Sequence, residues 1–144
     1  MNAPDPHFVS RVRDSFGRQR AMALIGASLT RVEPGEVEIA LPWREDLTQQ
    51  KGFIHGGILG MIADTACGYA AFSLMPAGGS LVTVEYKMNI LKPGRGSLLA
   101  QAKVIRPGRT LTVARAEVYA DDGRHVATML QTLMALPDRP DRPE

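Results

Sequence analysis

The sequence predicts an α+β fold in which an antiparallel sheet wraps around one long central helix. The segment from His55 to Leu74 is apolar around most of a helical circumference, and Asp64 is the only charged side chain within it. A helix that is apolar nearly all round is a buried helix. The chain beyond it, to Leu136, consists of strand-like runs that are separated by Gly-containing turns. An antiparallel meander that follows one buried helix is typical of a sheet that covers the helix on one face.

The N-terminal third predicts a short helix and a hairpin. Residues from about Phe8 to Gln19 place Phe8, Val12 and Phe16 at helical spacing among charged side chains. The run from Ala21 to Val32 is rich in apolar residues, and the alternation around Ile39 is that of a strand. The sequence Glu-Pro-Gly-Glu at 33–36 lies between them and is a turn signal. Residues 42–54 have the composition of a loop.

Four further strands complete the predicted sheet. In the first of them, apolar side chains alternate with polar ones, and Thr83 therefore faces away from Val82 and Val84, outside the core. The turns between the strands contain Pro-Gly at 93–94 and 107–108 and Asp-Gly at 122–123. The expected strands cover residues 82–90, 98–104, 110–120 and 125–136. A lone sheet around one helix leaves edges and a face to cover, so we expect the chain to associate with itself.

Length and composition limit the number of domains that the chain can form and the classes of partner that it can bind. A chain of 144 residues fits a single domain, which we assign to residues 1–136, and the tail 137–144 is so rich in Pro, Asp and Arg that we expect it to be disordered. The net charge is +2 and the arginines are scattered, which argues against a nucleic-acid partner. One cysteine, Cys67, permits no internal disulfide, and no signal peptide or membrane span is evident. These features predict a soluble, cytoplasmic protein.

The start of the central helix is a candidate binding site. The first backbone N–H groups of a helix lack internal partners and lie at the positive end of its dipole. Because Gly56 and Gly57 follow His55, a ligand oxygen could approach these amides closely. Such a site could stabilise the negative charge that develops on a thioester carbonyl. A loop that needs glycine for its turn explains the same three residues equally well.

Asp64 is the second candidate. A buried carboxylate costs several kcal/mol unless it is paired or functional, and Asp64 is too far along the helix to cap its start. A structural partner or a solvent channel would also explain it. Gly56 and Asp64 are eight residues apart, which corresponds to about 12 Å along a helix axis and some 80° around it. If both serve one reaction, they should come from two chains and form a composite site at a dimer interface.

Together these residues resemble a known family. Gln49, Gly52, His55-Gly56-Gly57 and Asp64, with this spacing, are similar to the hotdog-fold thioesterases of the PaaI-like and 4-hydroxybenzoyl-CoA thioesterase families. The resemblance extends from about residue 22 to residue 136. It implies an enzyme that hydrolyses an acyl-CoA to the free acid and CoA, without a cofactor, as a homodimer or a dimer of dimers.

The resemblance also implies residue roles. The Gly56 amide polarises the thioester carbonyl, and Asp64 of the partner subunit acts as nucleophile or general base. His55 supports the loop or the substrate. Gln49 orients the water or the substrate, and Thr83 corresponds to a Ser or Thr that assists the water in some members, although an ordinary strand threonine is as good an explanation. The family more often pairs Gln with a Glu acid and Asn with Asp, so the combination of Gln49 and Asp64 leaves the acyl group undetermined.

Substrate-binding roles are implied for Gly57, beside the oxyanion amide, and for the turn that carries Arg106, Arg109 and Thr110. In the family this turn region commonly meets the CoA nucleotide, and an Arg fork binds phosphate bidentately. A solvated hairpin tip explains the turn at least as well.

Other chemistries find no support. The sequence has no Gly-x-Ser-x-Gly elbow, and His7, His55 and His125 lack metal-ligand spacing, so we expect no metal. A packed thiol is the better interpretation of Cys67 than a nucleophile. Two alternatives to hydrolysis remain: a hydroxyacyl-CoA dehydratase or hydratase that uses His55 and Asp64, and a non-catalytic acyl-CoA-binding protein. Released CoA in a thiol assay distinguishes hydrolysis from both.

Overall fold

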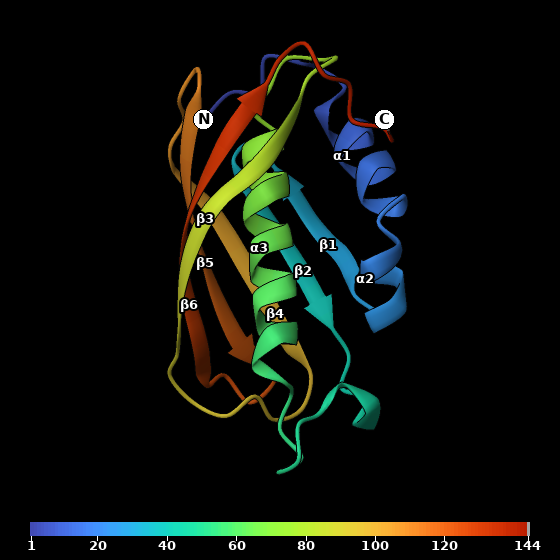
Figure 1. Cartoon of the computed structure of the whole chain (residues 1–144), viewed down its shortest axis with the longest axis vertical. Helices are drawn as coiled ribbons and strands as arrows, with labels where there is room; N and C mark the ends of the chain where they lie inside the picture. The colour runs from blue at the N-terminus through green and yellow to red at the C-terminus, as the bar shows by residue number, and fades with distance from the viewer. Residues whose placement is uncertain (144) are drawn as a thin grey trace.

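The fold consists of one six-stranded antiparallel sheet wrapped around a long helix, as predicted. A computed structural model describes residues 1–143 of the chain. Two short helices, α1 (Phe8–Gly17) and α2 (Arg20–Ile25), precede the hairpin of β1 (Ser28–Glu33) and β2 (Glu36–Leu41). The central helix α3 (Gly56–Phe72) follows a loop that contains a short 3-10 turn, Glu45–Leu47. The chain then forms β3 (Ser80–Ile90), β4 (Leu98–Arg106), β5 (Leu111–Ala120) and β6 (His125–Leu136), as Figure 1 shows.

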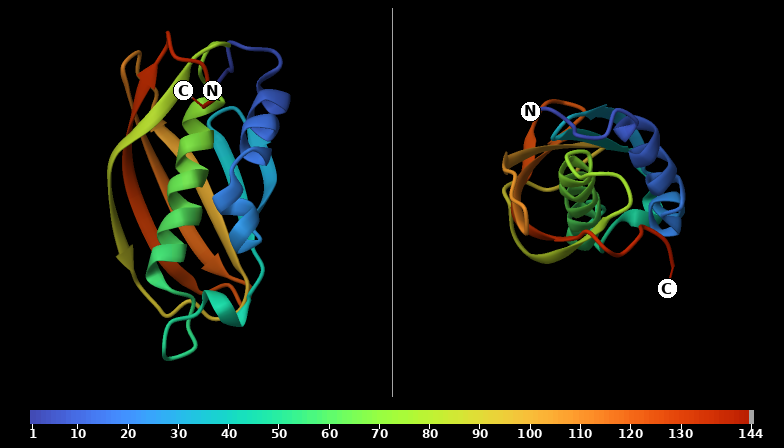
Figure 2. Two further views of the ribbon diagram at one scale, coloured as in Figure 1. Left: turned by 45° about the vertical axis from the view of Figure 1, so that its right-hand side comes forward. Right: turned by 90° about the horizontal axis from the view of Figure 1, so that it is seen from above.

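The order of the strands in the sheet is β1-β2-β4-β5-β6-β3. The first strand after the central helix, β3, is therefore an edge strand, because β4 joins β2 and β6 returns to pair with β3. Seen from above, the sheet curls around α3 (Figure 2). This topology places both ends of α3 beside the two ends of the exposed strand β3.

One sequence expectation for the N-terminal region was wrong. The apolar run from Ala21 to Val32 was expected to be a strand, but its first half forms α2. Gly26, with a φ of 75°, ends this helix in the left-handed conformation, and the amide of Ala27 donates to the Met22 carbonyl. Glycine adopts this conformation without the steric cost that other residues bear, so it separates the helix from β1. The hairpin of β1 and β2 is confirmed.

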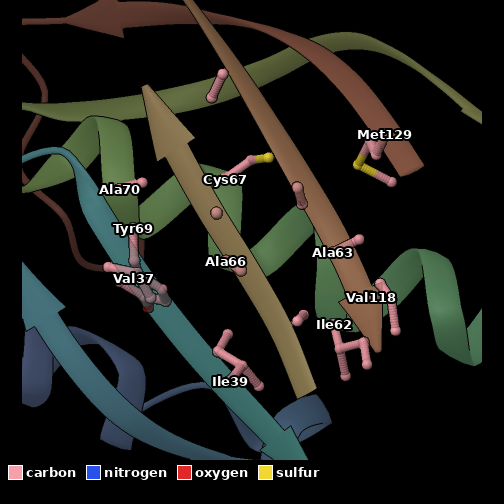
Figure 3. Close-up of a cluster of buried hydrophobic side chains, with 14 of the residues drawn as sticks. Val37, Ile39, Ile62, Ala63, Ala66, Cys67, Tyr69, Ala70, Val118 and Met129 are labelled. Carbon is pink, nitrogen blue, oxygen red and sulfur yellow. The ribbon is translucent and has the colours of Figure 1, made fainter. Parts of the chain in front are cut away.

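The central helix packs its small apolar side chains against the sheet. Figure 3 shows Ile62, Ala63, Ala66, Cys67 and Ala70 of α3 facing side chains of the sheet. All five are fully buried. Small side chains allow the helix to lie close to the strands. This close packing explains why a helix with several glycines forms here, because tertiary packing outweighs their propensity cost.

Arg11 of α1 caps the C-terminal end of the central helix. Its guanidinium donates to the carbonyls of Phe72 (3.3 Å) and Met75 (2.8 Å), stacks over the Phe72 ring, and pairs with Asp5 at 2.7 Å. The last carbonyls of a helix lack internal partners and carry the negative end of the dipole. A cation from α1 therefore stabilises this end of α3 and fixes the N-terminal helix on the domain.

The alternation in β3 is interrupted, which corrects a second expectation. Thr83 pairs with Leu133 and Glu85 with Thr132, so Val84 is the additional residue of a β-bulge. A bulge shifts the side-chain alternation by one position. Thr83 therefore faces α3, where its hydroxyl contacts Asp64, and does not point away from the core. Beyond the bulge, Tyr86 and Ile90 face α3, since their side-chain ends lie nearest to Gly60 and Gly56 respectively.

The C-terminal tail returns across the N-terminal helices (Figure 1). In the described part of the tail, residues 137–143, the Asp141 side chain pairs with Arg18 at 2.9 Å. The expected disorder of the tail stays a prediction, as does the single domain over residues 1–136; Glu144 lies outside the described residues. No helix among residues 1–143 combines the length and the apolar character needed to cross a membrane, and the cytoplasmic location also stays a prediction.

Candidate active site

The first turn of α3 leaves one backbone donor free. His55 is the N-cap of the helix, and its ring Nδ1 accepts the N–H of Gly57 at 2.8 Å. The His55 carbonyl accepts the amides of Ile58 and Leu59. Within residues 1–143 the Gly56 N–H has no acceptor. Of the two glycine amides that the sequence singled out, Gly56 is thus available to a ligand oxygen, whereas the Gly57 amide is used by His55.

Gln49 lies beside this free amide. Its backbone pairs with Phe53, and its side-chain carbonyl accepts the N–H of Lys51, so the loop before α3 is closed on itself. Gln49 and Gly56 line the same pocket, of about 370 Å³, together with Ile90 and Lys92. The structure therefore brings together two of the residues that the sequence assigned to the reaction, at the N-terminal end of α3.

Asp64 belongs to a different group of polar side chains. The Thr83 hydroxyl donates to Asp64 Oδ1 at 2.8 Å. The side-chain amide nitrogen of Gln131, on β6, donates both to the same oxygen and to the Thr83 hydroxyl oxygen, the latter at 2.7 Å. Gln131 is completely buried. The three side chains come from α3, β3 and β6, and they form a closed hydrogen-bonded cluster around one carboxylate oxygen.

The sequence reasoning identified Asp64 and Thr83 but missed Gln131. Strand β6 alternates in the pattern expected of a half-buried strand, and Gln131 falls on its buried face between Met129 and Leu133. A polar side chain at an apolar position of a strand was the available signal, because buried polar groups are as a rule paired.

Asp64 is half-buried, not buried among apolar side chains as the helix pattern suggested. Asp64 and Thr83, the latter next to the bulge in β3, line a pocket of about 170 Å³. Tyr69 and Leu81 line it as well, and the Tyr69 hydroxyl is paired with Ser15 of α1 at 3.0 Å. Within the described residues, Asp64 Oδ2 has no hydrogen-bond partner. One carboxylate oxygen is thus held and the other is available.

The two groups do not meet within one chain. Among residues 1–143, no residue lines both the pocket of Gly56 and Gln49 and the pocket of Asp64 and Thr83. This agrees with the separation along α3 that the helix geometry predicts. Within residues 1–143 the chain therefore presents two separate pockets, one beside a free backbone donor and one beside an oriented carboxylate.

Arg106, Arg109 and Thr110 are exposed and line neither of these two pockets; Arg106 ends β4, and the other two lie in the turn between β4 and β5. Arg109 and Thr110 line a third pocket, of about 600 Å³, against the C-terminal end of α3. Arg106 is not part of this pocket lining. The turn itself is tightly constrained, because a Cβ at Gly108 would lie 1.8 Å from the Leu111 carbonyl oxygen.

Cys67 is unsuited to nucleophilic chemistry. Burial raises the pKa of its thiol strongly, and the negative charges of Asp64 and Glu117 raise it further. A thiol in this environment stays protonated, and the thiolate is the reactive form. Among residues 1–143, no three His, Cys, Asp or Glu side chains gather in a way that could hold a metal ion.

Comparisons with known proteins agree with this architecture. A family model described as "Thioesterase superfamily" matches residues 51–127, a range that includes Gly56, Asp64 and Thr83. The chain is similar to the crystal structure of a thioesterase family protein from Silicibacter pomeroyi, with 50% identity and a TM-score of 0.87 over 90% of this chain and 98% of that one. The PaaI protein of E. coli, from the phenylacetic acid degradation operon, shares the fold at 21% identity, with a TM-score of 0.84 over 90% and 93% of the two chains.

Two relatives extend these findings. A protein of Halobacterium salinarum that carries an esterase name is 34% identical over 67% of this chain and 68% of its own length. The medium/long-chain acyl-CoA thioesterase YigI of Salmonella typhimurium is 24% identical over 58% of this chain and 63% of its own length. The resemblance to hotdog-fold, PaaI-like thioesterases is confirmed at the level of family and fold.

Proposed function

This chain belongs to the thioesterase superfamily, and on that premise we propose that it hydrolyses an acyl-CoA thioester to the free acid and CoA in a site shared between two subunits. The single observation that carries the proposal is a pair of half-sites: among residues 1–143, the Gly56 N–H in one pocket is unpartnered, and in another pocket Asp64 has one oxygen held and one oxygen free. A donor for the carbonyl oxygen and a general base or nucleophile for the attack together catalyse thioester hydrolysis, and a carboxylate can take the second role.

The edge strand β3 supports the shared site. Val82, Val84, Tyr86 and Ile90 are all between 43% and 54% exposed on this strand. Its open backbone edge is of the kind that pairs with another strand. The Thr83 end of β3 lies beside Asp64, and the Ile90 end lies beside Gly56. If two copies pair their β3 strands antiparallel about a two-fold axis, the Thr83 end of one strand lies next to the Ile90 end of the other. That arrangement brings Asp64 of one subunit toward Gly56 of its partner.

In the proposed reaction the Gly56 amide binds the thioester carbonyl oxygen and stabilises its negative charge. Asp64 can act in two ways. As a general base it takes a proton from water while the water oxygen bonds to the acyl carbon. The C–S bond then breaks with its electron pair on sulfur, and Asp64 returns the proton to the departing CoA sulfur. As a nucleophile it forms a mixed anhydride as CoA leaves, and water then cleaves that anhydride. Heavy oxygen from water that enters Asp64 during a single turnover identifies an anhydride cleaved at the aspartyl carbon, because general-base attack leaves the Asp64 oxygens unchanged.

The remaining residues have supporting roles. Gln49, which shares the pocket of Gly56, orients the substrate or the water, and the ring of His55 holds the first turn of α3 through Gly57. Thr83 directs the carboxylate. For the CoA nucleotide we retain Arg106, Arg109 and Thr110, whose exposed position beyond the end of α3 suits phosphate binding. Loss of either arginine should then raise KM with little change in kcat.

The name of the relative YigI, a medium/long-chain acyl-CoA thioesterase, supports an acyl-CoA as the substrate class. The test is to incubate the purified protein with phenylacetyl-, benzoyl-, short-chain and long-chain acyl-CoA and a thiol reagent. Stoichiometric release of free CoA and acid from at least one of them supports the proposal. Release of CoA from none of them, by a protein that binds CoA, would leave a non-catalytic acyl-CoA-binding protein as the better description.

A further inference from the structure

We propose that Gln131 is a positioning residue for the reaction, which holds Asp64 through one oxygen and so leaves the other oxygen aimed at the substrate. This inference rests on the proposed function of Asp64. Gln131 lies on β6, 67 positions from Asp64 in the sequence, and its side-chain amide nitrogen donates to Asp64 Oδ1.

The cluster restrains the carboxylate from two sides. Gln131 and Thr83 both donate to Oδ1, and Gln131 also donates to Thr83. The Thr83 hydroxyl accepts one N–H of the Gln131 amide and donates its own hydrogen to Asp64. The hydrogen bonds therefore all run toward the carboxylate, and no two donors face each other. Oδ2 accepts from no side chain or amide in the described chain. Two donors on one oxygen fix the plane of the carboxylate, which is what a base or nucleophile needs in order to meet a substrate at a defined angle.

This orientation of the Gln131 amide is energetically unfavourable at its carbonyl end. Its carbonyl oxygen, Oε1, is buried and lacks a hydrogen-bond partner within residues 1–143. Buried side-chain oxygens are nearly always satisfied, so an exception calls for a reason. A rotated amide would place this carbonyl oxygen against the Asp64 carboxylate, oxygen against oxygen, and would remove a donor from the charge. The carboxylate therefore determines the amide orientation, and the fold leaves Oε1 without a partner.

A residue kept only for packing would behave differently from a positioning residue. The neighbours of Gln131 on the same face of β6, Met129 and Leu133, are apolar and nearly fully buried. An apolar side chain of similar length at position 131 would remove the unpaired oxygen and continue this face. We therefore expect Gln131 to lower stability slightly, or to leave it unchanged, while it supports turnover, a trade-off that is common at active sites.

The decisive variant is Gln131→Met, which keeps the length of the side chain and removes both N–H donors. We expect kcat to fall about 10- to 100-fold, as for a lost hydrogen bond to a charged group, while KM changes by less than about two-fold. The melting temperature should be unchanged or higher. The matched control is Gln101→Met on β4, where an exposed amide donates to the half-buried Glu38; this variant should retain normal turnover.

A double variant with Thr83→Val tests whether Gln131 acts through Asp64. Because both donors hold the same oxygen, their effects on kcat should depend on each other, and the loss in the double variant should differ from the product of the two single losses. Independent multiplication of the two effects, or normal kcat in Gln131→Met, overturns the proposal. So does a lower melting temperature together with a raised KM, which marks a structural role.

These outcomes remain distinguishable from failure of the proposed function. If the wild-type protein releases CoA from no thioester, the hydrolase proposal fails, and the melting temperature of Gln131→Met still tests the claim about the unpaired amide. If the wild type is active and Asp64→Ala is not, the hydrolase proposal stands, whatever Gln131→Met shows.

Discussion

The Thr83 hydroxyl donates to Asp64 Oδ1 at 2.8 Å, although the two residues lie on different elements and are 19 positions apart in the sequence. The contact depends on the bulge at Val84, which divides β3 into two parts with opposite alternation. The strand therefore places the Thr83 hydroxyl against the carboxylate in the middle of α3, and the apolar Ile90 side chain against the first turn of α3.

Replacement of Asp64 by Ala should abolish turnover and leave the fold intact. The side chain is half-buried and contributes no apolar packing, whereas removal of a general base typically costs 10²- to 10⁴-fold in rate. Release of CoA measures the loss, and circular dichroism checks the fold. Asp14→Ala on the exposed face of α1 is the control. A folded Asp64→Ala protein with near-normal turnover excludes the mechanism.

Replacement of Thr83 by Val should lower kcat about 10-fold or more, because the change keeps the side-chain shape and removes a hydrogen bond to a charged group. Thr83→Ser keeps the hydroxyl and should restore most of the activity. If the Ser and Val variants lose activity equally, the hydroxyl is not the reason why Thr83 matters.

Mixing two inactive variants should restore part of the activity. In Gly56→Pro the proposed donor is absent. Proline fits the first helical position, and His55 already has the extended backbone, φ −58° and ψ 136°, that precedes proline. A Cβ at position 56 would lie 2.9 Å from Cδ1, the movable end of the Ile90 side chain, so this side chain must shift.

Each homodimer of Gly56→Pro or Asp64→Ala should be inactive, whereas a mixed dimer has both defects in one site and none in the other. Equal mixing after joint unfolding and refolding gives about half mixed dimers, so about a quarter of all sites should work. If subunit exchange is demonstrated by labelled chains and the mixture stays inactive, Asp64 and Gly56 do not share a site.

Replacement of Arg11 by Ala should lower the free energy of unfolding by about 1.5–3 kcal/mol, the range for hydrogen bonds to a charged group. The variant loses the cap on the Phe72 and Met75 carbonyls as well as the contact with Asp5. Urea denaturation measures the change. Arg20→Ala, an exposed arginine on α2, should be close to the wild type; equal losses in the two variants contradict a specific role for Arg11.

The ion pair between Asp5 and Arg11 also predicts that the free energy of unfolding depends on pH in the acidic range. The hydrogen bond from Arg11, followed by that from the His7 amide, lowers the pKa of Asp5 below its ordinary value of 3.8. A lowered folded-state pKa stabilises the fold above the unfolded-state pKa, and this stabilisation disappears as the pH falls below 3.8 toward the folded-state value. The stability difference between wild type and Asp5→Asn should thus be constant from neutral pH to about pH 5 and shrink below pH 3.8. A difference that stays constant down to the acid transition contradicts this assignment.

The sequence by itself determined the order of the main elements and the buried central helix with its bounds to within two residues, and it singled out Gly56 and Asp64 as candidate site residues. These features follow from local periodicity, from turn residues, and from a charge where a buried helix should have none, and all three signals lie within short segments of the chain. Helix geometry also predicted that Gly56 and Asp64 are too far apart to act together in one chain.

Only the tertiary structure decided which side chains surround Asp64. The bulge that turns Thr83 toward α3 arises from the pairing of β3 with β6, and Gln131 reaches the carboxylate because the sheet curls around the helix. The short α2 likewise ends at Gly26, whose left-handed backbone no periodicity reveals. Strand register and sheet curvature are properties of contacts between segments that are distant in the sequence. A pattern read along the chain can therefore identify the carboxylate, whereas the partners that orient it become visible only after folding.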